Sequence, residues 1–111
     1  MAAVPLNLTL EQGTDFQVNF TVRNKDQTPL NLFGYTAASE MRKHYTAEKK
    51  YDFDVTFVDR SRGRVSLSMS DSVTSTIPEG RYVYDVFIKS SNGTKTKVVA
   101  GMVLVQPGVS F

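Results

Sequence analysis

The chain has 111 residues, of which 41% are hydrophobic and 22% are charged, and its formal net charge is +2. This length fits one domain and leaves no room for a second core, so residues 1–111 are predicted to form a single domain. The absence of cysteine excludes disulfides and thiolate metal sites, and the nearly balanced charge argues against nucleic acid as the main partner.

The beginning of the chain lacks a basic region followed by an apolar run of signal-peptide length. No window approaches the roughly 20 apolar residues that a membrane span needs. We therefore expect a soluble chain that is made in a reducing cytosol and has no membrane as its partner.

The N-terminal part contains two stretches in which apolar and polar residues alternate. Side chains of a strand point to opposite faces with a period of two, so alternation predicts a strand with one face in a core. Residues 6–10 are expected to form a short strand, and residues 11–13 a turn into a longer strand at residues 15–23. The side chains that the longer strand would place in the core are those of Phe16, Val18, Phe20 and Val22.

Residues 35–50 permit two interpretations. Several side chains between Ala37 and Lys43 favour a helix, but propensity is a weak guide that tertiary context overrides. Alternation instead predicts a strand whose inward-facing side chains are those of Tyr35, Ala37, Ser39 and Met41. We expect a strand over residues 35–43 and then a charged loop at residues 44–50. An aromatic binding surface could be formed by Phe33, Tyr35, Tyr45 and Tyr51, but the favoured interpretation assigns Phe33 and Tyr35 to the core.

Two further strands are predicted at residues 51–57 and 64–70, where apolar residues alternate with aspartate, threonine and serine. The polar residues and glycine at positions 59–63 indicate a short hairpin between these strands. Antiparallel pairing of the two strands follows.

The C-terminal part predicts a last hairpin. A turn at residues 78–80 precedes a strand at residues 81–89, and Asn92-Gly93 is a strong hairpin signal because both residues tolerate positive φ. The final strand, residues 95–105, is apolar on both faces from Val98 onward. Part of its outer face is therefore expected to be covered, by this chain or by another.

About seven strands separated by turn signals predict an all-β, immunoglobulin-like, two-sheet antiparallel β-sandwich. A local feature supports this fold. Tyr82 follows Gly80 at the start of the next-to-last strand, where immunoglobulin domains carry their tyrosine corner, and Tyr84 stands where their second cysteine would be.

Residue types suited to catalysis or to ligand binding are sparse. The single histidine, His44, lies in a lysine-rich loop with no second ligand, and no serine–histidine–aspartate arrangement or phosphate-binding glycine motif is found. Asp52 and Asp54 could hold Ca²⁺ or act as acid and base, but a solvated outer strand face is the favoured interpretation. We expect no enzyme activity, no metal and no cofactor.

Two other groups of residues receive structural interpretations. Arg60, Arg62 and Arg64 could touch phosphate, yet three arginines at a hairpin tip are expected simply to be exposed. Three glycosylation sequons begin at Asn7, Asn19 and Asn92, and they are interpreted as chance combinations.

The two ends of the chain are predicted to lie beyond the strands as short arms, residues 1–5 and 106–111. They carry apolar side chains, and such arms fray unless they dock on a surface. Docking on a neighbouring subunit and simple disorder are both compatible with the sequence. The residues proposed for an interface are Val4, Pro5, Val109 and Phe111 from the arms and Tyr45 from the charged loop.

Five short motifs together cover nearly the whole chain: residues 13–16 (GTDF), 32–35 (LFGY), 41–43 (MRK), 80–85 (GRYVYD) and 101–109. They resemble motifs of small immunoglobulin-like β-sandwich virion proteins of tailed bacteriophages, and of the N-terminal domain of phage upper baseplate proteins. The motifs are structural, and the resemblance carries over no active-site residue.

The resemblance implies a non-enzymatic virion protein, made in the cytoplasm of a bacterial host. The first expectation is a capsid decoration or cement protein, and the alternative is a neck, tail or baseplate accessory subunit. Its partners would be other virion proteins, such as the major capsid protein or tail and neck subunits, and the chain would be a homo-oligomer or bound to a lattice. A hypothesis from another class is a carbohydrate- or receptor-binding module.

Overall fold

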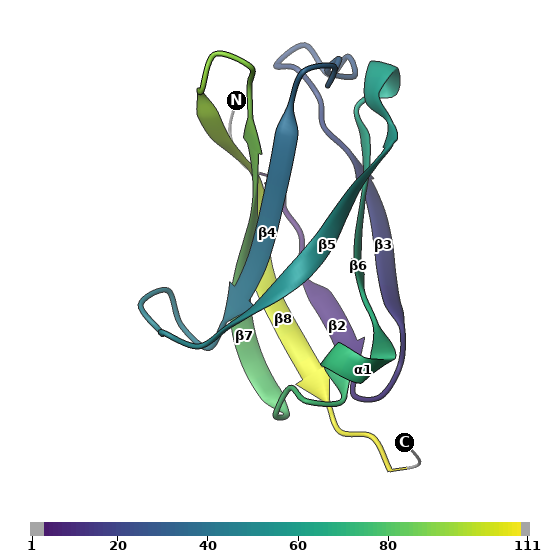
Figure 1. Ribbon diagram of the computed structural model, residues 1–111, viewed down its shortest axis with the longest axis vertical. Coiled ribbons are helices and arrows are strands. Elements are labelled where there is room, and N and C mark those ends of the chain that lie inside the picture. Colours follow the sequence, from purple (N-terminus) through teal and green to yellow (C-terminus); the bar gives the residue numbers. More distant parts are fainter. Residues whose placement is uncertain (1–3, 110–111) are drawn as a thin grey trace.

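The strands run along the length of a molecule that measures 43 × 28 × 22 Å (Figure 1). The computed structural model describes residues 4–109. In chain order its elements are β1 (Val4–Pro5), β2 (Leu8–Glu11), β3 (Phe16–Thr21), β4 (Thr36–Arg42), β5 (Lys50–Asp59), the 3-10 turn η1 (Arg60–Arg62), β6 (Arg64–Met69), the short helix α1 (Asp71–Thr74), β7 (Gly80–Lys89) and β8 (Lys95–Gln106).

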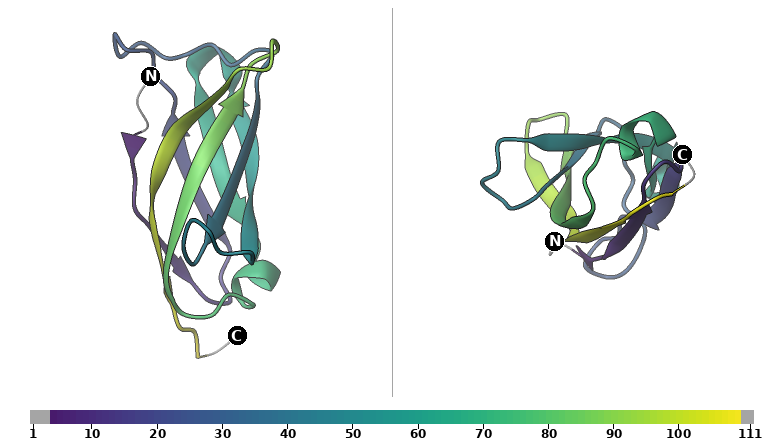
Figure 2. Two further views of the ribbon diagram at one scale, coloured as in Figure 1. Left: turned by 90° about the vertical axis from the view of Figure 1, so that its left-hand side faces the viewer. Right: turned by 90° about the horizontal axis from the view of Figure 1, so that it is seen from below.

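Two sheets face each other, and β5 belongs to both. The first sheet has the order β1/β2–β8–β7–β4–β5, and the second has the order β5–β6–β3. The ladder with β4 uses Lys50 to Phe53 of β5, whereas the ladder with β6 uses Asp54 to Asp59. The predicted immunoglobulin-like β-sandwich is confirmed, and Figure 2 shows its two layers from the side and from one end.

One pairing departs from the antiparallel expectation. β1 and β2 run parallel to β8, with Val4 opposite Val99 and Leu8 opposite Val103. The prediction that residues 1–5 lie beyond any strand is therefore wrong for Val4 and Pro5, because β1 extends the sheet past the edge of β8.

The predicted inward faces contain the core. All four inward side chains of β7 are buried, and β4 is a strand instead of a helix, with Ser39 and Met41 buried on its inner face. The Ser39 hydroxyl donates 2.7 Å to the carbonyl oxygen of Asp85, which removes the penalty of burying this polar group. The four side chains of β7 are Tyr82, Tyr84, Val86 and Ile88.

The predicted tyrosine corner is present. The Tyr82 hydroxyl donates a 2.7 Å hydrogen bond to the carbonyl oxygen of Pro78, four residues upstream. Tyr84 fills the position of the second cysteine, with its ring 5.9 Å from that of Phe53. Its hydroxyl donates 2.6 Å to the carbonyl oxygen of Leu6, and burial raises the pKa of this phenol to about 12.

A β-bulge explains why β8 is apolar on both faces. Val86 pairs with Val99 while Phe87 pairs with Lys97, so Val98 is an extra residue in the ladder. Val98 and Val99 are both buried as a result. An unbroken alternation would have turned one of them outward.

Two expectations near the predicted hairpin are wrong. Arg60 is not simply exposed, since its Nη1 donates 2.9 Å to the carbonyl oxygens of both Leu32 and Tyr35, and its guanidinium lies 3.9 Å from the Phe57 ring centre. Phe33 was assigned to the core but is 66% exposed, because the turn before β4 points it outward.

Candidate interaction surfaces

An apolar patch lies on the outer face of the first sheet. Met102 is 46% exposed and Leu104 is 41% exposed, and Met102 pairs across the ladder with the half-buried Val83. We call these three residues the β7–β8 patch. Directly opposite and diagonal neighbours on one sheet face are in contact range, so the patch offers a continuous apolar surface.

The N-terminal interface candidates adjoin this patch. Pro5 pairs with Ala100, one outward position before Met102, and Val4 is exposed at the edge of the sheet. The parallel β1–β8 ladder thus brings Val4 and Pro5 close to the β7–β8 patch. The sequence pattern had indicated only that the outer face of β8 is apolar.

The C-terminal candidate that the structure describes, Val109, lies elsewhere. Val109 is 98% exposed at the far end of β8, and Phe111 lies outside the described residues. The segment before Val109 is tied down, because Gly108 donates its amide to Oε1 of Gln12 at 3.1 Å and the Gln12 Nε2 donates to the Ile77 carbonyl at 2.7 Å. The prediction that residues 106–111 lie beyond the strands is wrong for Gln106, which ends β8 opposite Glu11, and the chain after it is attached to the sandwich up to Gly108.

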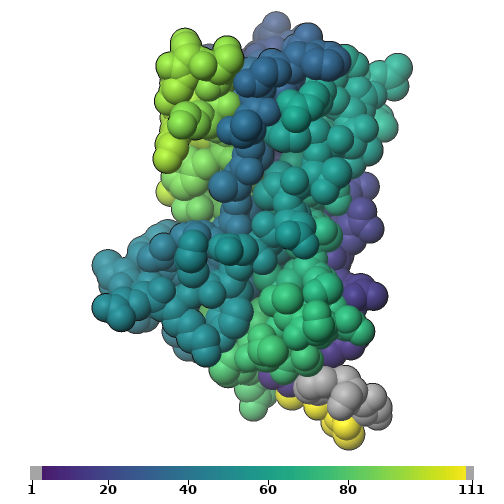
Figure 3. All heavy atoms as spheres, in the orientation of Figure 1, coloured from purple at the N-terminus to yellow at the C-terminus, as the bar shows by residue number. Residues whose placement is uncertain are grey.

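Tyr45 belongs to a third region. It is 68% exposed on the loop between β4 and β5, which stands out from the body below the β7–β8 hairpin in Figure 3. His44 in the same loop is exposed, with its Nδ1 3.2 Å from the Thr46 hydroxyl. Of the four predicted interface residues that the structure describes, Val4 and Pro5 are neighbours, whereas Tyr45 and Val109 lie in separate regions.

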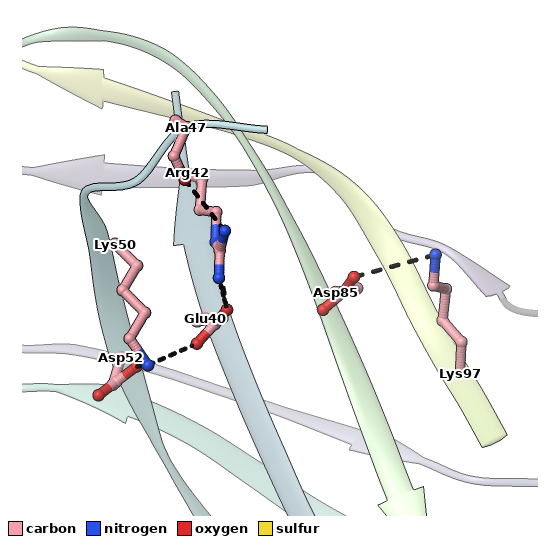
Figure 4. A network of polar contacts seen from close by, with 7 residues as sticks. All are labelled: Glu40, Arg42, Ala47, Lys50, Asp52, Asp85 and Lys97. Atoms are coloured by element: carbon pink, nitrogen blue, oxygen red, sulfur yellow. Dashed lines mark hydrogen bonds and ion pairs between the residues drawn. The ribbon is translucent and has the colours of Figure 1, made fainter. Parts of the chain in front are cut away.

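Charged side chains cross the outer face of β4, β5 and β7 between these regions (Figure 4). Glu40 is the centre, 2.6 Å from Arg42 and 3.0 Å from Lys50. Lys50 is also 3.6 Å from Asp52, and Arg42 donates to the carbonyl oxygen of Ala47 at 3.0 Å. The network fixes the start and the end of the 43–49 loop to the sheet.

The pKa values of two carboxyl groups in this region, those of Glu40 and Asp85, are shifted in opposite directions. The hydrogen bond from Arg42, followed by that from Lys50, lowers the pKa of Glu40. Burial raises the pKa of Asp85, and the nearby negative charge of Glu40 adds to this effect, while Lys97 at 3.9 Å partly offsets it. The ionised form of Asp85, which lies opposite Glu40 on the neighbouring strand, is therefore disfavoured in the folded protein.

The aspartates considered for calcium lie on a solvated strand face. Asp52 and Asp54 are both exposed, and Asp52 is engaged by Lys50. Within residues 4–109, no group of three or more histidine, cysteine, aspartate or glutamate side chains is arranged to hold a metal ion.

Three structurally important residues were not singled out from the sequence. Gln12 holds the C-terminal arm, and Asn7, seen only as a sequon, accepts the amide of Met102 through Oδ1 at 3.1 Å. Gly101 lies beneath the Leu6 carbonyl oxygen, which would be 2.2 Å from a Cβ at that position. The only available signal for Gly101 was a glycine inside a strand, which often marks a close backbone approach.

Across the part of the chain that the structure describes, no helix has the length and apolar character needed to span a bilayer. Neither a protein-family model nor a curated protein matches this sequence.

Solved structures give a likeness of fold. The N-terminal domain of phage TP901-1 ORF48 is similar with a TM-score of 0.63 over 92% of this chain and 94% of that chain, at 12% sequence identity. The Lin-41 filamin domain is similar with a TM-score of 0.49 over 90% of this chain and 84% of that chain, at 18% sequence identity. A likeness at this TM-score is too loose to carry an argument. At these identities the likeness concerns the fold alone: the chain shares its β-sandwich with a domain of a phage protein.

Proposed function

We propose that the chain is a structural subunit of a tailed-phage particle and that it acts by binding other particle proteins instead of by catalysis. The observation that supports this most is the likeness to the phage ORF48 domain, which extends over almost the full length of both chains. The motif resemblance to virion β-sandwich proteins points in the same direction, although each fact by itself concerns only the fold.

Within this proposal two locations compete. Capsid decoration is the expectation from the motifs, and a tail or baseplate location is the alternative. The motif resemblance to the N-terminal domain of phage upper baseplate proteins supports the tail or baseplate location.

The β7–β8 patch is the surface we assign to the main contact. It is apolar, lies on the outer face of the first sheet, and adjoins the exposed Val4 and Pro5. Contiguous exposed apolar side chains mark binding surfaces, whereas scattered ones do not.

The test uses particles made by the phage or prophage that encodes the chain. An antibody to the chain, imaged by electron microscopy on purified particles, is expected to label the particle, and the labelled end decides between head and tail. Particles that contain none of the chain by mass spectrometry would refute the proposal.

A pair of variants tests the assigned surface. Met102→Glu/Leu104→Glu is expected to remain folded and to be incorporated at a level at least about tenfold lower, because charge is placed in the apolar contact. The matched control is Phe33→Glu/Val58→Glu, which adds the same charge at two exposed apolar residues outside the patch. Equal incorporation of both double variants would remove the patch from the proposal.

A further inference from the structure

The outer face of the first sheet carries a group of positive charges at the end next to the β7–β8 hairpin. Lys89 is directly opposite Lys95, and Lys97 follows two positions later on β8, so that all three exposed side chains share this face. Like charges directly opposite each other on a sheet are destabilising. Neither Lys89 nor Lys95 forms an ion pair in the part of the chain that the structure describes. We call these three lysines the basic corner.

Acidic side chains lie diagonally across the same face. Glu40 on β4 is opposite Asp52 on β5, and Asp54 is the next outward residue of β5 (Figure 4 shows the first two). Arg42 and Lys50 engage Glu40, but Asp52 is only within 3.6 Å of Lys50, and Asp54 has no ion pair among residues 4–109. We call Glu40, Asp52 and Asp54 the acidic corner.

Uncharged residues separate the two corners. Phe87 on β7 is opposite Ala38 on β4, and both lie on the outer face, where Ala38 is exposed and Phe87 is half-buried. Along β7 the outward charge changes sign across Phe87, from Asp85 on one side to Lys89 on the other. A groove of about 840 Å³ opens here, and five of the six corner residues line it. The two groups of charges therefore face a common space.

This arrangement of charges is complementary to itself. Two copies that face each other across a two-fold axis use the same surface, so that each residue of one copy meets its counterpart site on the other. An axis that lies between the copies and crosses the strands diagonally over Phe87 and Ala38 exchanges the two corners. With strands about 4.8 Å apart and about 3.4 Å per residue, the ladder register brings each basic residue over an acidic residue of the second copy: Lys89 over Asp54, Lys95 over Asp52, and Lys97 over Glu40.

We propose that two copies of the chain associate through this face, with the basic corner of each on the acidic corner of the other. A partner that is only acidic or only basic would meet repulsion at one of the two corners, whereas a second copy matches both. The lysine stems would cross the groove and cover Phe87 and Ala38 with their methylene groups. This contact uses no residue of the β7–β8 patch and does not depend on a phage function.

The first test is sedimentation equilibrium of the purified chain over a range of concentrations. The wild type is expected to dimerise reversibly and more weakly as salt is added. Lys89→Glu/Lys95→Glu and Asp52→Lys/Asp54→Lys should each raise the dimer Kd at least about tenfold, because like charges then face each other. The matched control is Lys25→Glu/Arg62→Glu, an equal charge change at exposed residues outside the first sheet, which should leave the Kd unchanged. A wild type that stays monomeric up to its solubility limit, or an equal loss in the control, would overturn the proposal.

The second test mixes the two double variants, after thermal unfolding has shown that each is folded. One carries acidic residues at all four changed or matching positions and the other carries lysines there, so the mixture is expected to form a heterodimer at least as tight as the wild-type dimer. The quadruple variant that combines both changes restores opposite charges within one chain and should dimerise by itself, which supplies the readout if a double variant does not fold. Absence of both the heterodimer and the quadruple-variant dimer would overturn the inference even if the wild type dimerises.

Discussion

The hydroxyl of Tyr84 on β7 donates a 2.6 Å hydrogen bond to the carbonyl oxygen of Leu6, 78 positions earlier in the chain. This bond passes through the interior and connects the N-terminal edge of the first sheet with its centre. It gives a core phenol a function that the immunoglobulin disulfide has elsewhere, namely holding a strand in a fixed place.

Tyr84→Phe is expected to be less stable at pH 7 by about 1 kcal/mol, because the Leu6 carbonyl loses its partner. Its stability should also depend less on alkaline pH. The folded-state pKa of about 12 exceeds the reference value of 10.0, so the stabilisation by neutral Tyr84 is complete below pH 10 and is lost as the pH rises to 12. This loss is on the order of 2 kcal/mol.

Urea unfolding at pH 8, 10 and 11 measures both effects. Tyr45→Phe is the control, since Tyr45 is exposed and its loss should leave the pH profile of the wild type intact. The same alkaline slope in Tyr84→Phe as in the wild type would contradict the assignment of that slope to Tyr84.

Gly101→Ala is expected to destabilise the protein by several kcal/mol, roughly 2–4, since the new Cβ would overlap the Leu6 carbonyl oxygen at 2.2 Å. Because β1 and β2 would have to move away from β8, the amides of residues 6–11 should also exchange faster. Gly93→Ala, with open space around its Cβ but a φ of +91°, should cost only about 1 kcal/mol. Thermal unfolding compares the two, and equal losses would mean that the close approach is not the cause.

Arg60→Ala should cost about 2–3 kcal/mol, because two carbonyl oxygens lose a charged donor and the Phe57 ring loses its cation. Arg62 is two positions away, and its one ion pair within residues 4–109 is with Asp59 at 3.8 Å, so Arg62→Ala should change the free energy of unfolding by less than about 0.5 kcal/mol. Urea unfolding of both variants measures the difference. If the two arginines prove equivalent, Arg60 does not hold the segment before β4 as described.

Glu40→Gln and Asp85→Asn should change the acid stability profile in opposite ways. The pKa of Glu40 is lowered from 4.5, so its stabilisation is present above that pH and is lost as the pH falls through the folded-state value. The pKa of Asp85 is raised from 3.8, so its ionised form opposes folding and this opposition disappears as the pH falls.

At pH 7, Glu40→Gln is expected to be less stable by about 0.5–1 kcal/mol, and Asp85→Asn to be as stable as the wild type or more stable. Between pH 5 and 3 the first variant should lose less stability than the wild type, and the second should lose more. Urea unfolding at three pH values across this range provides the comparison. Identical acid profiles for the two variants would contradict the shifts.

The sequence identified the long strands because each of them buries one face, and a period of two reports that burial directly. This is why β4 could be recognised as a strand although its residues favour a helix. The tyrosine corner was also accessible, since its spacing from Gly80 is local.

The pairing of the strands with one another could not be predicted from alternation. Alternation says which side chains face inward but not which strand lies alongside, so neither the parallel β2–β8 ladder nor the division of β5 between two sheets was predicted. Arg60 was misjudged for a related reason: its acceptors at Leu32 and Tyr35 are 28 and 25 positions away.

The candidate surfaces were predicted in part. The apolar character of β8 on both faces was visible, but the bulge at Val98 decides that Val98 is buried while Met102 and Leu104 remain outside. The separation of β4 from β5 beyond Phe53 had no sequence signal, because it results from where the β4–β5 ladder stops.

The parallel pairing of the first and last strands has a mechanical consequence. When the chain is pulled from its two ends, the β2–β8 ladder is loaded along its length, and its bonds bear the force together instead of opening one after another. A domain connected in this way can transmit tension through itself without unravelling from either terminus.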